Sequence, residues 1–189
     1  GRHIAENAVA VLGACMLAGA DLNRIIPAFA EVSPAKGRGE RLTLQLSGGS
    51  FTVIDESYNA NPASMRAAIA LLAATEPGPD GRRIAVLGDM LEMGEHAADV
   101  HRALADPLFE HEIQHVWLAG TDMAHLRDEL GEDRDVVYLD DADQLAAYAA
   151  AHVRPGDVLM IKSSNGVGFS RIVAHLKEKY SPAIAPDQD

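Results

Sequence analysis

Cysteine, aromatic side chains and positive charge are all scarce in this sequence. Its one cysteine, Cys15, lies in an apolar helical run, which excludes an intrachain disulfide and a cysteine-based metal cluster. Aromatic residues make up 5% of the chain, and 16 basic residues face 28 acidic ones, for a net charge of -12. Because no general field would attract phosphates, we expect no nucleic-acid or anionic-membrane surface. Any anionic ligand must then be held by a few local cations and backbone amides.

Long apolar runs and N-terminal targeting signals are missing too. The run from Ala8 to Ala20 falls short of the roughly 18 residues that a membrane span needs, so we expect no membrane insertion. The start, GRHIAENAV, has neither the layout of a signal peptide nor an initiator methionine, which favours a piece of a larger protein. With 189 residues and an apolar fraction of 48%, the chain has room for one well-buried domain and a remnant of another.

The first 40 residues predict two helices and a linker. Ile4 to Leu17 is helix-like with Gly19 as its stop, and Asp21 is placed to cap a second helix that runs to about Val32. The stretch SPAKGRGER, residues 33–41, is dense in proline, glycine and cations, which is typical of a linker.

From Leu42 onward the pattern is that of an α/β fold. LTLQL and FTVID read as two strands joined by a Gly-Gly turn. Helices are expected over about 62–74, 96–111, 123–130, 142–152 and 169–180, and strands over 83–89, 116–119, 136–139 and 158–162. Such alternation predicts a mostly parallel sheet with helices on both faces. The tail, residues 181–189, is expected to fray.

Ligands of open α/β sheets bind beyond the carboxyl ends of the strands, so residues that follow each apolar run are candidates. Asp55 and Glu56 are adjacent, so their side chains point to opposite faces and cannot form a matched acid-base pair. One of them could accept hydrogen bonds from ribose hydroxyls; a solvated strand end is the competing interpretation. Asn61 is accounted for as a helix N-cap, which leaves Tyr58 and Asn59 less explained.

The segment IKSSNGVGF could be an anion-binding loop before a helix, or a plain helix-start turn. Gly166 and Gly168 supply only part of a dinucleotide fingerprint, since Arg171 stands at its third glycine. Lys162 ends the strand and has little reason to be there unless it meets an anion.

Two further patterns concern metal and phosphate binding. GDMLEMGEHAADVH offers acidic residues with His96 and His101, but a spacing of five puts the histidines on different helix faces, so a structural loop is favoured and no metal site is predicted. The phosphate-binding pattern G-x-x-x-x-G-K-[ST] does not occur in the chain.

Four segments resemble, in order, the C-terminal part of the Mur ligase family: GRHIAENAVA, IDESYNANPASMRAAIALL, IAVLGDMLEMGEHAADVH and GDVLMIKSSNGVGFSRIVAHL. The second and third resemble most closely the members that add a D-alanyl-D-alanine dipeptide, since related ligases and folylpolyglutamate synthetase share the architecture but not SYNANP. The resemblance extends to about Lys179. It implies that residues 1–36 are the last helices of a central ATP-binding domain and that 37–189 form a complete Rossmann-like C-terminal domain.

The resemblance also implies a reaction, ATP-dependent peptide-bond formation in peptidoglycan precursor synthesis, by a cytoplasmic and monomeric full-length enzyme. A carboxylate of UDP-N-acetylmuramoyl-tripeptide takes the γ-phosphoryl group of ATP, and the amine of D-alanyl-D-alanine attacks the acyl phosphate. Positioning and charge neutralisation dominate such chemistry. ATP and Mg²⁺ would be bound mainly by residues upstream of this chain, so the fragment alone is expected to be inactive, with no catalytic residue and no metal ligand assigned to it.

Individual positions take their expected roles from the same resemblance. Glu56 stands where aspartate is usual, Ile4 replaces the first asparagine of a helix-opening pattern, and Ser163 replaces a glycine, which reduces the backbone freedom of its loop. The residues expected on the ATP side are Asn7, Arg38, Asp55 and Glu56. Those expected at the substrate or interdomain site are Tyr58, Asn59, Asn61, Lys162, Ser163, Ser164 and Asn165.

The sequence leaves two other functions open. The chain could be a free-standing α/β module that binds a nucleotide or an amino acid without ligating anything, or part of another amide ligase of the same architecture. A helical remnant cut from its core would leave apolar side chains such as Val9, Leu12 and Met16 exposed, and a dimer would be compatible with that.

Overall fold

A computed structural model describes residues 2–30 and 36–181, and the chain divides into two compact units, residues 1–34 and 35–189. The first unit consists of α1 (Arg2–Leu17) and α2 (Leu22–Ala30). Gly19 has a φ of 80°, which turns the chain after α1, and the carboxylate of Asp21 accepts a hydrogen bond from the Asn23 amide at 2.9 Å. The predicted stop and cap are confirmed.

The two helices of the first unit leave much apolar surface uncovered. Val9 and Met16 are exposed over 68% and 55% of their surface, whereas Leu12 is half-buried. Two short helices cannot bury a whole apolar face against each other. No helix within residues 2–30 or 36–181 has both the length and the apolar character needed to cross a membrane.

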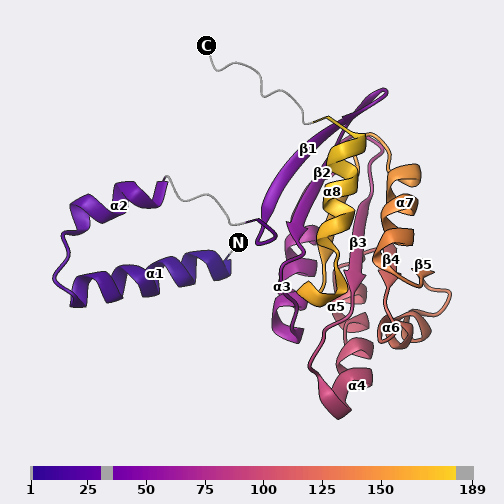
Figure 1. Cartoon of the computed structure of the whole chain (residues 1–189), viewed down its shortest axis with the longest axis horizontal. Helices are drawn as coiled ribbons and strands as arrows, with labels where there is room; N and C mark the ends of the chain where they lie inside the picture. Colours follow the sequence, from indigo (N-terminus) through magenta and orange to yellow (C-terminus); the bar gives the residue numbers. More distant parts are fainter. Residues whose placement is uncertain (1, 31–35, 182–189) are drawn as a thin grey trace. The chain divides into compact units, whose positions relative to one another are not determined.

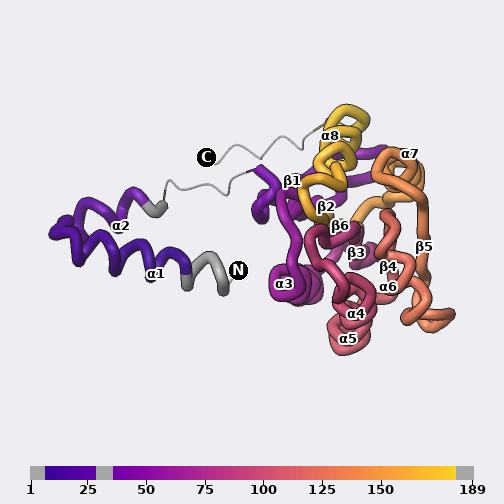
Figure 2. The backbone as a smooth tube through the Cα atoms, turned by 60° about the horizontal axis from the view of Figure 1, so that its bottom comes forward, coloured from indigo at the N-terminus to yellow at the C-terminus, as the bar shows by residue number. Residues whose placement is uncertain are grey.

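Within residues 36–181, the second unit is built on a six-stranded sheet with the order β1-β2-β6-β3-β4-β5. Figure 1 labels these strands except β6, which Figure 2 labels between β2 and β3. Its strands are β1 (Glu40–Leu46), β2 (Gly49–Glu56), β3 (Arg83–Gly88), β4 (His115–Ala119), β5 (Asp135–Leu139) and β6 (Val158–Lys162). Among the strands that the structure describes, only β1 runs antiparallel, in a hairpin with β2; the other neighbouring pairs are parallel. The last strand in sequence lies between β2 and β3, in the middle of the sheet.

Helices cover both faces of this sheet (Figure 2). One face carries α3 (Pro62–Ala73), α5 (Ala105–Glu110) and α6 (Met123–Leu130), and the other carries α7 (Ala142–His152) and α8 (Ser170–Lys179). The short α4 (Ala97–Arg102) follows the 3-10 turn η1 (Gly94–His96), and η2 (Asn165–Val167) precedes α8. The predicted α/β fold, a mostly parallel Rossmann-like sheet with helices on both faces, is confirmed.

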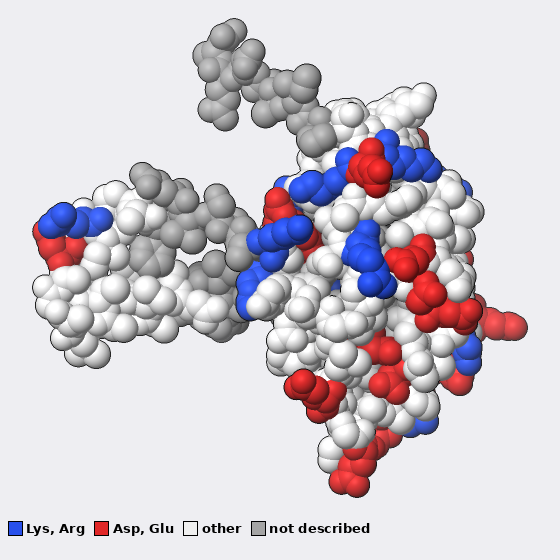
Figure 3. All heavy atoms as spheres, in the orientation of Figure 1, with Lys and Arg blue, Asp and Glu red and all other residues white. Residues whose placement is uncertain are grey.

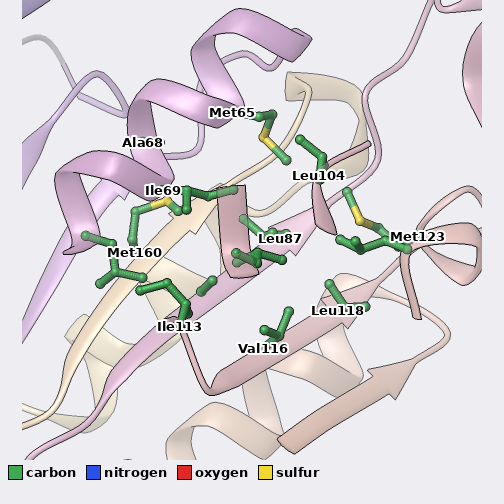
Figure 4. Packing of buried hydrophobic residues seen from close by; sticks show 14 of the residues in the cluster. Met65, Ala68, Ile69, Leu87, Leu104, Ile113, Val116, Leu118, Met123 and Met160 are labelled. Carbon is green, nitrogen blue, oxygen red and sulfur yellow. The ribbon is translucent and has the colours of Figure 1, made fainter. Parts of the chain in front are cut away.

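Each face of the sheet has its own apolar core. Figure 4 shows one of them, where Met65 and Ile69 from α3 converge with Leu104 on Leu87 of β3. The central strands β3 and β6 are buried on both sides, which explains their unbroken apolar sequences.

Two of the predicted segments differ clearly from the structure. The helix expected over 96–111 is interrupted after Arg102, because Pro107 has no N–H to donate to the carbonyl of Ala103, and the Arg66 guanidinium donates to that carbonyl instead at 3.0 Å. The predicted linker ran to Arg41, but β1 begins at Glu40, which pairs with Asp55. Parts of the expected second helix and linker, at 31–35, and all of the tail beyond 181 lie outside the described residues.

Candidate functional site

The candidate site lies at the carboxyl ends of β2, β6 and β3, which are neighbours in the sheet. Glu56 at the end of β2 lies opposite Lys162 at the end of β6, and Leu87 of β3 lies opposite Lys162 on the other side. Since the strands are parallel, the segments that follow them meet at one edge, as expected for ligand sites of this fold. All the predicted site residues except Asn7 lie in the segments at this edge. Asn7 is exposed on α1, in the first unit.

Glu56 and Lys162 form the charged pair of the site. The Lys162 ammonium lies 3.7 Å from a Glu56 carboxylate oxygen and donates a hydrogen bond of 2.8 Å to the backbone carbonyl of Asn59. The pKa of Lys162 is lowered, chiefly because burial disfavours its charged form; Glu56 opposes that shift, and the positive charge of Arg38 adds to it. The anion that Lys162 meets is therefore in part internal, and Arg38 lies close enough for its charge to be felt there.

Asp55 points to the opposite face of the sheet from Glu56, as the alternation of a strand requires. It is buried, and its Oδ1 accepts hydrogen bonds from the Ser57 amide at 3.0 Å and the Ser57 hydroxyl at 2.6 Å. Its Oδ2 is buried and makes no hydrogen bond to any residue within 2–30 or 36–181. An unpaired buried acceptor is costly in a folded protein, which makes this carboxylate more than a solvated strand end.

Tyr58 stacks against Arg38, whose guanidinium carbon lies 4.1 Å from the centre of the ring. The Tyr58 amide donates to the carbonyl of Gly37 at 3.1 Å, and the Gly39 amide donates to the carbonyl of Asp55 at 2.8 Å. The segment that contains Arg38 is thus attached to the end of β2 by backbone hydrogen bonds on both sides of the arginine.

Asn61 is the N-cap of α3, as its sequence context predicts. Its side chain accepts from the Ser64 amide at 2.8 Å, and the Ser64 hydroxyl accepts from the Asn61 amide at 3.0 Å, which completes a capping box. Asn59 is exposed; its side-chain oxygen accepts from the Ala60 amide at 2.9 Å, while its carbonyl receives Lys162. Both asparagines therefore have local structural roles, and Asn59 also helps to hold the buried cation.

The loop between β6 and α8 passes from buried to exposed residues. Ser163 and Ser164 are buried, and Asn165 is exposed at the start of η2. Gly168 has a φ of 85° and lies under the guanidinium of Arg171, where a Cβ would come within 2.8 Å. No side chain within residues 36–181 caps α8, and the Arg171 and Ile172 amides of its first turn donate to the carbonyls of Gly168 and Phe169 at 3.0 and 2.9 Å.

A pocket of about 290 Å³ opens between these segments. Six residues line it: Lys36, Gly37, Ser57, Tyr58, Asn165 and Ser170. Two of them were expected to be site residues, Tyr58 and Asn165. The pocket combines a lysine, hydroxyl groups, a carboxamide and a tyrosine ring next to the first turn of α8, a set that suits a polar ligand with negative charge.

The segment after β3 is held by three neighbours. The Asp89 carboxylate accepts from the Met123 amide at 2.9 Å, and the Leu91 amide donates to the Ser164 hydroxyl at 2.9 Å. Between them, the Met90 amide donates to Nε2 of buried His101, whose Nδ1–H donates to the Ala97 carbonyl at 2.6 Å. Burial raises the pKa of Asp89 above 3.8. His101 is therefore a structural acceptor, in line with the loop interpretation.

Metal ligands were not expected here, and the part of the chain that the structure describes has no group of three or more His, Cys, Asp or Glu side chains able to hold an ion. Figure 3 shows acidic and basic side chains interspersed on the visible face of the second unit. The cations near the pocket, Lys36 and Arg38, are thus local features of an acidic protein.

Sequence reasoning missed Ser57, Gly37, Ser170 and the role of His101. Ser57 stands between two chosen positions and could have been found as the residue best placed to bond Asp55. The contact of Gly37 with Tyr58 and that of His101 with Met90 depend on tertiary structure and leave no local signal.

This geometry defines a class: a Rossmann-like α/β domain with a polar pocket at the carboxyl edge of a parallel sheet. A family model described as "Mur ligase, glutamate ligase domain" matches residues 37–165. The chain belongs to the Mur ligase family.

Curated relatives and solved structures agree with that assignment. UDP-N-acetylmuramoyl-tripeptide–D-alanyl-D-alanine ligases of Mycobacterium tuberculosis H37Rv and Bacillus subtilis 168 are each 31% identical, over 91% and 94% of this chain. A crystal structure of MurF from Acinetobacter baumannii has a TM-score of 0.76 at 25% identity over 94% of this chain and 38% of that one. MurF ligase from Thermotoga maritima, solved in complex with ADP, has a TM-score of 0.71 at 23% identity, over 92% of this chain and 37% of that one. At this identity the likeness supports the fold alone. The chain spans 37% and 38% of the two curated relatives' lengths.

Proposed function

We propose that this chain is the C-terminal part of a cytoplasmic, ATP-dependent ligase that joins D-alanyl-D-alanine to UDP-N-acetylmuramoyl-tripeptide. The observation that carries the proposal is the set of polar groups at the carboxyl edge, where Lys162, Glu56 and Arg38 gather next to a pocket, in a chain whose curated relatives bear that name. The free-standing module is not favoured by these relatives, of which this chain spans little more than a third.

The proposed reaction has two steps. An oxygen of the tripeptide carboxylate attacks the γ-phosphorus of ATP and ADP leaves; the amine of the dipeptide then attacks the acyl carbon, phosphate leaves, and the nitrogen loses a proton. Such steps need positioned groups and charge neutralisation more than covalent help from the protein. In this proposal Asn7, Arg38, Asp55 and Glu56 serve the nucleotide side.

The remaining site residues would serve the dipeptide and the closure of the domain. Burial of Ser163 and Ser164 fixes the start of a loop whose exposed part, with Asn165, leads to the uncapped N-terminus of α8. The positive end of the helix dipole there favours a carboxylate, such as the one that the dipeptide carries. Tyr58, Asn59, Asn61 and Lys162 would complete this side.

Residues 1–36 are proposed to be the last helices of the central ATP-binding domain. The exposed apolar side chains of α1, such as Val9 and Met16, support this, because a domain core would cover them. We further propose that Mg²⁺ and the phosphates of ATP are held by residues outside this chain and that the fragment alone is inactive.

Activity of the full-length protein tests the proposal. Purified enzyme with ATP, Mg²⁺, the UDP-linked tripeptide and D-alanyl-D-alanine should release phosphate and form the pentapeptide product, followed by chromatography and mass spectrometry. Lys162→Ala should lower kcat/KM by about tenfold or more, because it leaves Glu56 unpaired at the crevice. Lys177→Ala, at an exposed position of α8, is the matched control and should change little. If dipeptide were refused and another amine accepted, the chain would belong to a different ligase.

A further inference from the structure

The stacking of Arg38 on Tyr58 suggests how the mouth of the pocket is organised. Tyr58 is 47% exposed as a residue, and the guanidinium carbon of Arg38 lies 4.1 Å from the centre of its ring. Stacking uses the face of a guanidinium and leaves its N–H donors pointing outward in the plane of the group. An arginine held this way is prepared to receive an anion at its edge.

The backbone is built to hold this stack. Gly37 has a φ of 76°, and a Cβ there would lie 3.0 Å from both the Cβ and the amide nitrogen of Tyr58. Only a residue without a side chain allows the chain to pass so close to Tyr58, and the hydrogen bond from the Tyr58 amide to the Gly37 carbonyl fixes that approach at 3.1 Å. Arg38 follows directly, so the position of the arginine is set by the same residue on which it stacks.

The hydroxyl of Tyr58 makes no hydrogen bond to any residue within 36–181. Arg38 lies over its ring, and Tyr58 is one of the residues that line the pocket. The ring is therefore the part of this side chain that the fold uses. A tyrosine that supports a neighbouring cation needs only its ring, whereas one that contacts substrate through a hydrogen bond needs its hydroxyl.

We propose that Tyr58 is a positioning residue that acts through Arg38: its ring holds the guanidinium at the mouth of the pocket, where the arginine receives an anionic group of the nucleotide. This assignment rests on the proposed function for the identity of the ligand and moves Tyr58 from the dipeptide side to the nucleotide side.

A double-mutant cycle on nucleotide binding tests the assignment. In the full-length protein, the dissociation constant of a non-hydrolysable ATP analogue should rise about two- to fivefold in Tyr58→Leu, the range expected for loss of a cation–π contact at an exposed site. Arg38→Ala should raise it at least about tenfold. The double variant should then bind as weakly as Arg38→Ala alone, within about twofold, because Tyr58 has nothing left to position. Multiplication of the two effects would mean that Tyr58 contacts the ligand directly and would overturn the proposal.

Tyr58→Phe is the matched variant, since it keeps the ring and removes the hydroxyl. It should restore most of the affinity lost in Tyr58→Leu; if it behaved like leucine, the hydroxyl would be the working group and the ring would not. A normal dissociation constant in Tyr58→Leu would also overturn the proposal.

The stack can be tested without any nucleotide. In NMR spectra of this chain, the side-chain signals of Arg38 should show upfield ring-current shifts that persist in Tyr58→Phe and vanish in Tyr58→Leu. Absence of these shifts in the unmodified chain refutes the positioning role whether or not the protein is a ligase. Presence of the shifts with no product formed by the full-length enzyme would instead refute the proposed function alone.

Discussion

Replacing His101 with phenylalanine tests the most consequential contact behind the candidate site. His101 is fully buried, and it accepts a hydrogen bond from the amide of Met90, which is also buried. Phenylalanine fills a similar volume but offers no acceptor, so the Met90 N–H would be left without a partner at a cost of about 1–3 kcal/mol. Loss of the bond to the Ala97 carbonyl adds about 0.5–1.5 kcal/mol. We therefore expect a destabilisation of about 1.5–4.5 kcal/mol.

The assay is urea or thermal unfolding of the chain followed by circular dichroism. For a domain of this size, that loss corresponds to a fall in Tm of about 3–18 °C. His96→Phe is the control, because the His96 side chain is 74% exposed and its replacement should stay within about 0.5 kcal/mol. The NMR amide signals of Leu91 and Ser164 should also shift in the His101 variant. Leu91 follows Met90 directly and bonds to the Ser164 hydroxyl, and the Ser164 amide bonds to the Asp89 carbonyl. A loss of stability no larger than that of the control would refute the reasoning that His101 holds this loop.

Two further outcomes follow from neighbouring residues. Burial raises the pKa of Asp89, so the stability that its protonated carboxyl contributes is present below the unfolded pKa, near 3.8, and is lost as the pH rises through the folded pKa. Asp89→Asn removes this titration, so the unfolding free energy of the variant relative to wild type should increase with rising pH. A difference that stays constant in urea titrations across that pH range would contradict this expectation. Gly88→Ala would place a Cβ 2.5 Å from the Phe169 ring and 2.9 Å from the Ser163 Cβ, and should lower the free energy of unfolding by about 1–3 kcal/mol. Gly13→Ala, whose new Cβ has no neighbour within 4 Å among the described residues, should be neutral or stabilise the helix by up to about 1 kcal/mol. Equal effects of the two variants in denaturant titrations would contradict the crowding argument.

The sequence by itself determined the fold class and the local structure. Alternating apolar strands and helices predicted a mostly parallel sheet, because strands buried on both faces have unbroken apolar runs, as β3 and β6 do. Local chemistry also predicted the caps at Asp21 and Asn61, since a cap bonds only to residues two or three positions away. Pro107, whose effect on the helix before it went unrecognised, was equally visible in the sequence.

Only the tertiary structure decided how the site is assembled. Insertion of β6 between β2 and β3 brings Lys162 to Glu56 and to the carbonyl of Asn59, across 103 positions of the chain. No local pattern encodes such a pairing, because it depends on the order of strands in the sheet. The same holds for the bond from Met90 to His101 and for the contact of Arg38 with the Tyr58 ring, because each of them depends on how the folded chain brings separate segments together.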